Sequence, residues 1–343
     1  MARVVSDGWL LARILRSPGD AAALDARGWT DLLAIARAEQ MIGTLGWRLQ
    51  GMAMPPAVTR ILADARASAE HGRTLALWEA EAARRALAPL GVPVLLLKGT
   101  AFVAAGLMAG QGRSIGDLDI LVPHASLDAV ERALLAAGWE WVKPDPYDDA
   151  YYRRWMHELP PLIHRYRDRM IDVHHTILPL TARITPDAEA LLADAVPLRT
   201  TSPGGLAMLS RTDVIVHAAA HLFADGDLAG GMRNLWDVHC LLADYGVEGL
   251  VERAEHHGLA DAVDRAVRLA AALYGAGATL SPGDRLCLRR VTARDGWGRA
   301  TRPVTRLGFY VRSHWLRMPP AMLARHLWTK WRGAGWRERT APE

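Results

Sequence analysis

Cysteine is nearly absent from this chain. The 343 residues include only two, Cys240 and Cys287, and both lie in apolar surroundings that are typical of a helix. So few cysteines exclude a disulfide framework of the kind that stabilises small secreted domains. The pattern predicts reduced thiols in a hydrophobic core and a cytoplasmic protein.

Long hydrophobic runs are also missing. No apolar stretch reaches the roughly 20 residues that a helix needs to cross a bilayer. The residues after Met1 show no secretion signal, because charges interrupt the segment from Trp9 to Arg16. The sequence therefore excludes a membrane-spanning protein, and its length allows one large domain or two ordinary ones.

Lysine is scarce, although the chain is basic. Of 41 basic residues only Lys98, Lys143 and Lys330 are lysine. Lys98 follows the apolar run Val94 to Leu97, which predicts a short strand. An ammonium group at that position suits a phosphate, since it is a compact point charge. The alternative is a strand-end lysine that extends into solvent.

The residues after Lys98 predict a tight turn into a helix. Gly99 and Thr100 precede the segment from Ala101 to Ala109, which has small and apolar residues and no proline. The free N–H groups at the start of such a helix can bind an anion. Gly99 would let a phosphate approach the backbone, and Thr100 would cap the helix or bind the phosphate through its hydroxyl.

Two carboxylates begin the next predicted strand, which runs from Asp117 to Val122. Side chains alternate along a strand, so Asp117 and Asp119 share one face. Two carboxylates so close repel each other unless a cation lies between them, and Mg²⁺ prefers such ligands together with substrate phosphates. The alternative is a strand entry with two solvated aspartates.

A third carboxylate lies on a later predicted strand, Arg169 to His174. Asp172 stands there between two aliphatic residues, in a position that otherwise suits the core. It could complete a two-metal site or accept a proton from an attacking hydroxyl. His174 shares its face and could orient a phosphate, a metal-bound water or the acceptor.

Other polar residues carry weaker signals. His174 and His175 point to opposite faces of a strand, so this pair cannot readily bind one ion. His217 and His221 lie one helical turn apart without a third ligand, and we interpret them as polar residues on a helix face. Asp237, in an otherwise apolar helix, could reach the cleft or instead serve as a cap or buried ion-pair partner.

These motifs resemble the DNA polymerase beta type nucleotidyltransferase superfamily. More narrowly, LLLKG, Arg113 ahead of DLDILV, HELPPL and IDVHH resemble an uncharacterised bacterial nucleotidyltransferase family, often found beside genes for peptide natural products such as lasso peptides. The motifs span roughly residues 92–177. Two departures are a threonine at position 100, where the superfamily usually has Gly or Ser, and a long interval before Asp117.

The resemblance implies a role for each matching residue. It makes Asp117, Asp119 and Asp172 the metal-binding carboxylates, and Gly99 and Thr100 the phosphate turn. Lys98 and Arg113 become phosphate contacts. Apart from the resemblance, the positions of His174 on its strand and Asp237 on its helix make them candidates for a supporting role behind these residues. The implied cofactor is Mg²⁺ or Mn²⁺, and the implied co-substrate is ATP or another nucleoside triphosphate.

The expected fold is α+β, with a small mixed sheet of the nucleotidyltransferase type between two helical regions. Alanine-rich helical patterns fill residues 1–90, a mixed pattern covers 91–180, and helical patterns return over 181–343. Within the first region we expect helices over Trp9 to Leu15, Trp29 to Leu49 and Ala57 to Ala88.

The final segment is basic and rich in tryptophan. Residues 301–343 contain nine basic and two acidic residues, and Trp315, Trp328, Trp331 and Trp336 lie among them. Such a segment could bind nucleic acid or a membrane surface. We favour a final amphipathic helix that packs its tryptophans on the body of the protein.

The sequence predicts a metal-dependent nucleotidyltransferase with an unidentified acceptor, which the resemblance suggests is a ribosomal peptide. Attack at the α phosphorus gives nucleotidyl transfer, whereas attack at the γ phosphorus would make the same scaffold a kinase. Two alternatives from other classes are a nucleic-acid-associated regulator of the toxin–antitoxin type and a noncatalytic nucleotide-binding protein.

Overall fold

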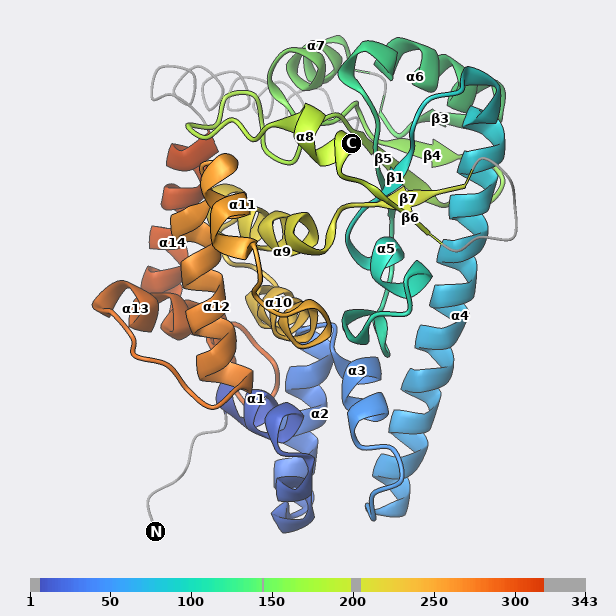
Figure 1. Ribbon diagram of the computed structural model, residues 1–343. Helices are drawn as coiled ribbons and strands as arrows, with labels where there is room; N and C mark the ends of the chain where they lie inside the picture. Colours follow the sequence, from blue (N-terminus) through green and yellow to red (C-terminus); the bar gives the residue numbers. More distant parts are fainter. Residues whose placement is uncertain (1–6, 144, 199–204, 318–343) are drawn as a thin grey trace, which may run out of the picture.

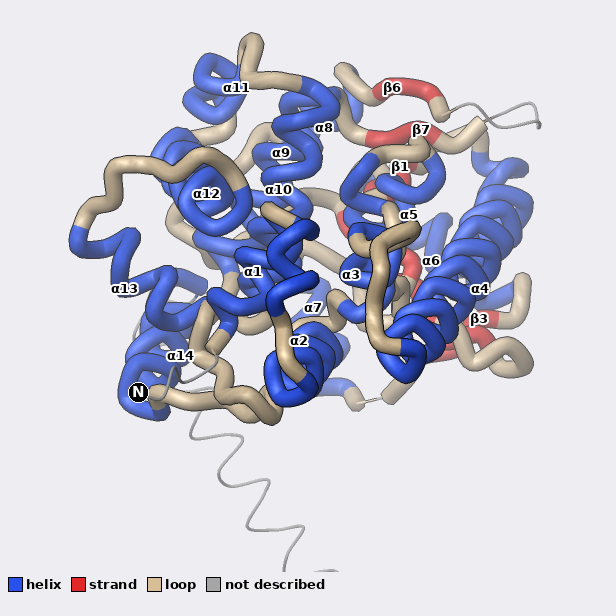
Figure 2. The backbone as a smooth tube through the Cα atoms, turned by 90° about the horizontal axis from the view of Figure 1, so that it is seen from below, coloured by secondary structure: helices blue, strands red, loops and turns tan. Residues whose placement is uncertain are grey.

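The computed structural model describes residues 7–143, 145–198 and 205–317. Strands lie at one side of the molecule, and the C-terminal helices lie at the other (Figures 1 and 2). This arrangement confirms the α+β class. Cys240 and Cys287 are free and buried, as expected.

Four α-helices precede the sheet, and the first three pack together at one end of the molecule (Figure 1). The single helix expected from Trp29 to Leu49 is two helices, because the chain turns at Gln40, whose φ is +55°. The fourth helix is the longest, at 32 residues. Their bounds are α1 Gly8–Arg16, α2 Ala26–Ala38, α3 Ile42–Arg48 and α4 Pro56–Leu87.

The sheet has seven strands in the order β3-β4-β5-β2-β1-β7-β6. Its centre is mixed, because β2 pairs parallel with β5 and antiparallel with β1. The bounds are β1 Leu95–Leu96, β2 Leu118–Leu121, β3 Trp139–Trp141, β4 Leu162–His164, β5 Met170–His174, β6 Val196–Pro197 and β7 Ala207–Met208.

Two of these strands come from the region expected to be helical. β7 pairs parallel with β1, and β6 pairs with β7. Each has only two residues, which is too short for an alternating pattern to be visible in the sequence. The sheet therefore extends beyond residue 180, whereas the division of the chain into three regions stays a prediction.

Among the described residues, four α-helices lie between the strands and six follow the last strand. The first group is α5 Lys98–Ala104, α6 Leu127–Ala136, α7 Pro146–Trp155 and α8 Ala188–Ala193; the second is α9 Arg211–Ala220, α10 Gly231–Tyr245, α11 Leu250–His256, α12 Ala260–Tyr274, α13 Pro282–Val291 and α14 Pro303–Arg317. Helix α9 continues into a π-helical turn, His221–Asp225. In the described part of the chain, no helix is both long and apolar enough to span a bilayer.

The basic C-terminal segment is described only in part. Helix α14 buries Phe309 and Ser313, while Trp315 is half-exposed beneath the guanidinium of Arg183. This part packs on the body of the protein through Phe309, whereas its tryptophan stays half-exposed. The remaining residues, 318–343, with Trp328, Trp331 and Trp336, lie outside the described residues.

Candidate active site

The carboxylates of β2 and β5 are brought together by the pairing of these strands. In the parallel register Asp119 lies directly opposite Asp172. Asp117 is exposed and lies one residue before β2. Alternation along each strand sends Leu118 and Ile120 into the core, where both are buried. The sheet thus places the three predicted aspartates around one point.

Asp119 is buried and ionised. Its Oδ1 accepts a hydrogen bond from Lys98 Nζ at 2.6 Å and lies 2.9 Å from His174 Nε2. Burial opposes the charge, but Lys98 and His174 outweigh it and hold the pKa of this carboxyl well below its usual range. Within the described residues Oδ2 makes no hydrogen bond, so this atom remains able to bind an ion.

Asp172 has the opposite character. It is partly buried, and burial together with the charges of Asp119 and Glu158 raises its pKa to about 7. A carboxyl with this pKa retains a proton over much of the neutral range. The site therefore has more acidic groups than the cations around it can neutralise, which is the condition that a bound divalent cation would relieve.

Lys98 reaches Asp119 from an unusual backbone conformation. Its φ is +47°, in the left-handed region that residues with a side chain rarely adopt. The chain is fixed on one side by a hydrogen bond from Leu97 N to Asp119 O and on the other by α5. Such conformations persist where the surrounding structure requires them, often at functional sites.

Gly99 and Thr100 lie in the first turn of α5, but they do not form the expected open turn. A Cβ on Gly99 would lie 2.6 Å from Arg113 Nε, so the glycine makes room for this guanidinium. The Thr100 hydroxyl is buried and has no hydrogen-bond partner in the described structure. The helix begins three residues earlier than expected, at Lys98 instead of Ala101, and Thr100 does not cap it.

Arg113 and Asp237 form a buried ion pair. The guanidinium of Arg113 also lies 5.4 Å from the ring centroid of Phe102. Asp237 lies 3.8 Å from a second guanidinium, that of Arg233. Burial raises the pKa of Asp237, although both arginines oppose the shift. Asp237 is thus a buried ion-pair partner, one of the two roles its position in an apolar helix suggested.

A small pocket joins Lys98 to this ion pair. It has a volume of about 60 Å³, and Lys98, Arg113, Asp237, His217, His221 and Asn234 are among the residues that line it. His217, interpreted from the sequence as a polar residue of a helix face, is buried in its wall. Its imidazole is held neutral, because burial and the nearby Lys98 lower its pKa well below the usual value.

The uncharacterised nucleotidyltransferase family has a model that matches residues 25–275. The chain belongs to this family. The match includes every residue of the site described above, and the family supports general nucleotidyl transfer as the chemistry of the protein. No curated protein matches the chain.

One acidic residue of this nucleotidyltransferase was missed as a site residue. Glu158, the acid of HELPPL, lies with its Oε2 3.5 Å from His174 Nδ1. It also contributes to the raised pKa of Asp172. Glu158 lies outside any regular strand and pairs with His174 through an isolated bridge. Because Glu158 lies outside a regular strand, hydrophobic periodicity could not predict its position at the site. The sequence signal that could have suggested a role was the acidic residue directly after His157 in HELPPL.

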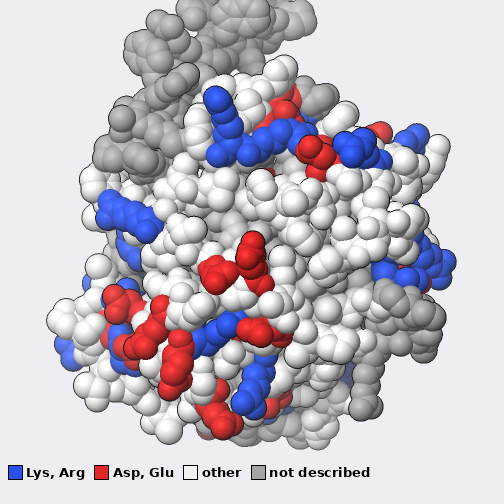
Figure 3. All heavy atoms as spheres, turned by 45° about the horizontal axis from the view of Figure 1, so that its top comes forward, with Lys and Arg blue, Asp and Glu red and all other residues white. Residues whose placement is uncertain are grey.

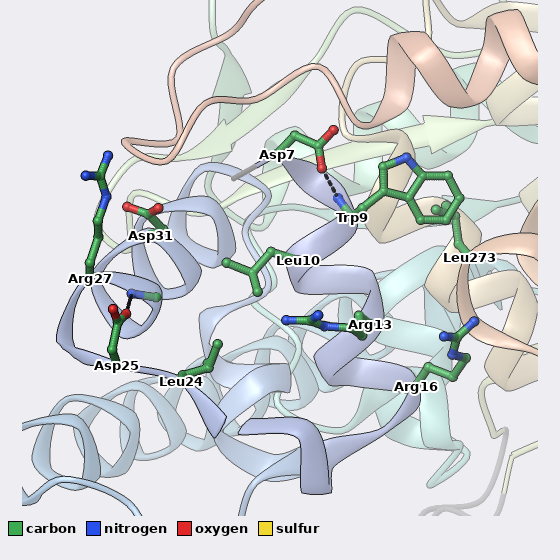
Figure 4. A pocket seen from close by; sticks show the side chains of 11 residues that line it. Asp7, Trp9, Leu10, Arg13, Arg16, Leu24, Asp25, Arg27, Asp31 and Leu273 are labelled. Atoms are coloured by element: carbon green, nitrogen blue, oxygen red, sulfur yellow. Dashed lines mark hydrogen bonds between the residues drawn. The ribbon is translucent and has the colours of Figure 1, made fainter. Parts of the chain in front are cut away.

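The larger hollows of the nucleotidyltransferase lie elsewhere. One, of about 530 Å³, lies between α1 and α2 and is lined by Trp9, Arg13, Arg16, Arg27 and Asp31, among others (Figure 4). Another, of about 590 Å³, lies against α4 and includes Arg66 and Arg73. Neither is lined by Lys98, whose Nζ bonds Asp119, whereas the smaller pocket is. We place the site at the smaller pocket because its chemistry, rather than its size, fits the family.

Basic and acidic side chains are mixed on the molecular surface. Figure 3 shows acidic groups in small clusters with basic groups among them, separated by uncharged surface. On the face in this view, no extended basic patch of the kind that suits a polyanion is visible.

Proposed function

We propose that the protein is a metal-dependent nucleotidyltransferase that transfers a nucleotidyl group from a nucleoside triphosphate to an acceptor. One observation carries the proposal: Asp119 and Asp172 lie opposite each other on β2 and β5, with Lys98 in contact with Asp119. Family membership supports the reaction class. Our proposal adds to the family assignment a divalent metal, a nucleoside triphosphate and an acceptor.

Asp117, Asp119 and Asp172 are the residues that would hold Mg²⁺ or Mn²⁺. Their fit to such an ion rests on the raised pKa of Asp172, which shows that the acidic groups lack sufficient positive charge. When bound, the ion would supply charge neutralisation for the triphosphate and the transition state. These carboxylates would therefore select a metal-bound nucleotide over a free one.

Lys98 and Arg113 would bind phosphate oxygens. Both line the pocket beside Asp119, and His217 and His221 add hydrogen-bonding groups to its wall. Lys98 currently bonds Asp119, and a flexible lysine can turn to a phosphate when another cation takes that carboxylate. Gly99 and Thr100 would support this arrangement by allowing Arg113 to lie close to α5.

Asp172 would act on the acceptor. A carboxyl with a pKa of about 7 can accept a proton from an attacking hydroxyl near neutral pH. An acceptor carboxylate would need no such base. We propose a ribosomal peptide as the acceptor, as the resemblance of the sequence motifs suggests, and a cytoplasmic location, which the free buried cysteines support.

The experiment that tests the function distinguishes attack at the α phosphorus, which releases pyrophosphate, from attack at the γ phosphorus. The protein is incubated with Mg²⁺ and ATP, GTP, CTP or UTP, and the released products are resolved as pyrophosphate or phosphate. Pyrophosphate release that Asp119→Asn abolishes supports nucleotidyl transfer. Release of phosphate alone would identify a kinase, and metal-independent binding of all four nucleotides would contradict the proposed site.

A further inference from the structure

We propose that His157, Glu158 and His174 form a second metal site, for a transition-metal ion such as Zn²⁺, beside the aspartates. One ligand atom from each residue lies within 4.8 Å of the other two. From the sequence, His174 and His175 are unsuited to one ion, because neighbouring residues of a strand point to opposite faces. The structure instead brings His157, from a different segment, close to His174. This inference does not depend on nucleotidyl transfer.

The distances fit a small ion with short bonds. His174 Nδ1 lies 3.5 Å from Glu158 Oε2, and His157 Nε2 lies 3.8 Å from the same oxygen. A tetrahedral zinc ion with bonds of about 2.0–2.1 Å separates its ligand atoms by roughly 3.3–3.4 Å. Small side-chain movements would bring the three atoms to that spacing, and a water molecule would complete the coordination.

The backbone holds this group of residues in place. His175 N donates to His157 O at 2.9 Å, and Leu159 N donates to Val173 O at 2.9 Å. These bonds fix the segment around Glu158 antiparallel to the end of β5, with Glu158 opposite His174. The ligands are therefore positioned by paired backbone rather than by a mobile loop, which lowers the cost of ordering them on binding.

The hydrogen bonding of His174 points to a cation at its other nitrogen. Its Nε2 faces the ionised Asp119 carboxylate at 2.9 Å and therefore carries the proton of that hydrogen bond. Nδ1, the other ring nitrogen, lies 3.5 Å from Glu158 Oε2, so it is the atom of His174 that would bind the ion. A carboxylate that orients a ligating histidine through its other nitrogen is common at metal sites.

His157 supplies the third ligand atom. Its Nε2 is the ring nitrogen that faces Glu158 Oε2. The ring of His157 lies 5.1 Å from the ring of His174, centroid to centroid. Two imidazoles and one carboxylate suit zinc and similar ions, whereas Mg²⁺ prefers oxygen ligands, so the two sites would take different metals.

The test uses the full-length protein, stripped of metal by a chelator and then desalted. Zn²⁺ binding is measured by calorimetry, and Co²⁺ binding by visible absorption, which is much stronger for four-coordinate than for six-coordinate cobalt. We expect one tight equivalent and a four-coordinate spectrum. His157→Gln and Glu158→Gln should each weaken binding by at least about tenfold, whereas His71→Gln, on the exposed surface of α4, should not change it.

Thermal melting in chelator shows whether a variant folds, so that lost binding is not confused with lost structure. Asp172→Asn provides the second control, because it should abolish transfer and keep the zinc equivalent. Zinc binding without any transfer activity would therefore contradict only the proposed function. Wild-type protein that binds neither Zn²⁺ nor Co²⁺ tightly would overturn the second metal site.

Discussion

Asp119 and Asp172 lie opposite each other on neighbouring parallel strands, yet their carboxyl groups prefer different ionisation states. Lys98 and His174 contact Asp119 and stabilise its charge, whereas Asp172 is partly buried among other acids. The two residues resemble each other in the sequence, since each lies between aliphatic residues on a strand. The structure predicts that removing their charges has opposite effects on stability.

Asp172→Asn should stabilise the metal-free protein, and Asp119→Asn should destabilise it. The first substitution relieves repulsion, with a gain of at most about 4 kcal/mol in the free energy of unfolding at pH 8. The second leaves the ammonium of Lys98 without its carboxylate, although the amide oxygen still accepts a hydrogen bond, a loss of up to about 3–5 kcal/mol for a buried pair. Chemical denaturation in chelator measures both, and equal shifts of the same sign would contradict the difference between these carboxyls.

The stability of the metal-free protein should fall as pH rises toward 8. The pKa of Asp172 is about 7 in the folded protein and 3.8 in its ordinary state. Between these two pKa values the folded protein binds more protons than the unfolded chain. The contribution of protonated Asp172 to the free energy of unfolding is therefore complete below the lower pKa and is lost as pH rises through the folded-state pKa. Melting temperatures of the wild-type protein and of Asp172→Asn, measured from pH 5 to pH 8, isolate the contribution of Asp172. An identical pH dependence in the variant would exclude Asp172 as the source.

Nucleotide binding should require a divalent cation. A triphosphate and the carboxylates of Asp117, Asp119 and Asp172 repel one another without one. Calorimetry with ATP in Mg²⁺ and in EDTA measures the difference, and we expect no detectable binding in EDTA. Equal affinities under both conditions would show that the triphosphate binds away from these residues.

Lys98→Ala should weaken ATP binding or turnover by about 1.5–3 kcal/mol, the usual contribution of a hydrogen bond to a charged group. Lys143→Ala is the matched control, because Lys143 is an exposed lysine distant in sequence from the site motifs. Deletion of residues 332–343 should leave ATP affinity unchanged. Retention on RNA or anionic vesicles that depends on this tail and not on Lys98 would instead favour the nucleic-acid or membrane alternative.

Asp237→Asn should destabilise the protein by about 3–5 kcal/mol, because it leaves the buried guanidiniums of Arg113 and Arg233 without their carboxylate. Asp244→Asn, on the same helix, removes a charge from a more exposed position and is the control. Chemical denaturation of both variants measures the effect. A loss of nucleotide affinity with unchanged stability would show that Asp237 acts on the ligand directly.

The predictable part of the site lies on regular strands. Alternation along β2 and β5 is visible in the sequence, and it correctly put Asp119 and Asp172 on polar positions of otherwise buried strands. The parallel pairing that sets them opposite each other is a long-range contact and carries no local signal. The same limit applies to His217, which reaches the pocket only because α9 packs beside it.

The unpredicted part depends on individual backbone conformations and close contacts. Lys98 adopts a positive φ that a lysine rarely shows, and the start of α5 was placed three residues late. Gly99 allows the close approach of Arg113, which lies 14 positions later in the chain. Neither feature follows from periodicity or composition.

Helix α4 has a consequence for how the protein can be divided. Its 32 residues span about 48 Å at the usual helical rise, and it runs beside both the N-terminal helices and the sheet (Figure 1). Near its end Glu79 accepts hydrogen bonds from Arg167, whose guanidinium also lies over Trp139 of β3. A fragment that begins at residue 91 would expose the sheet surface that α4 covers. Strands β2 and β5 and the N-terminal helices should therefore be kept in one polypeptide, since neither part is expected to be stable without the other.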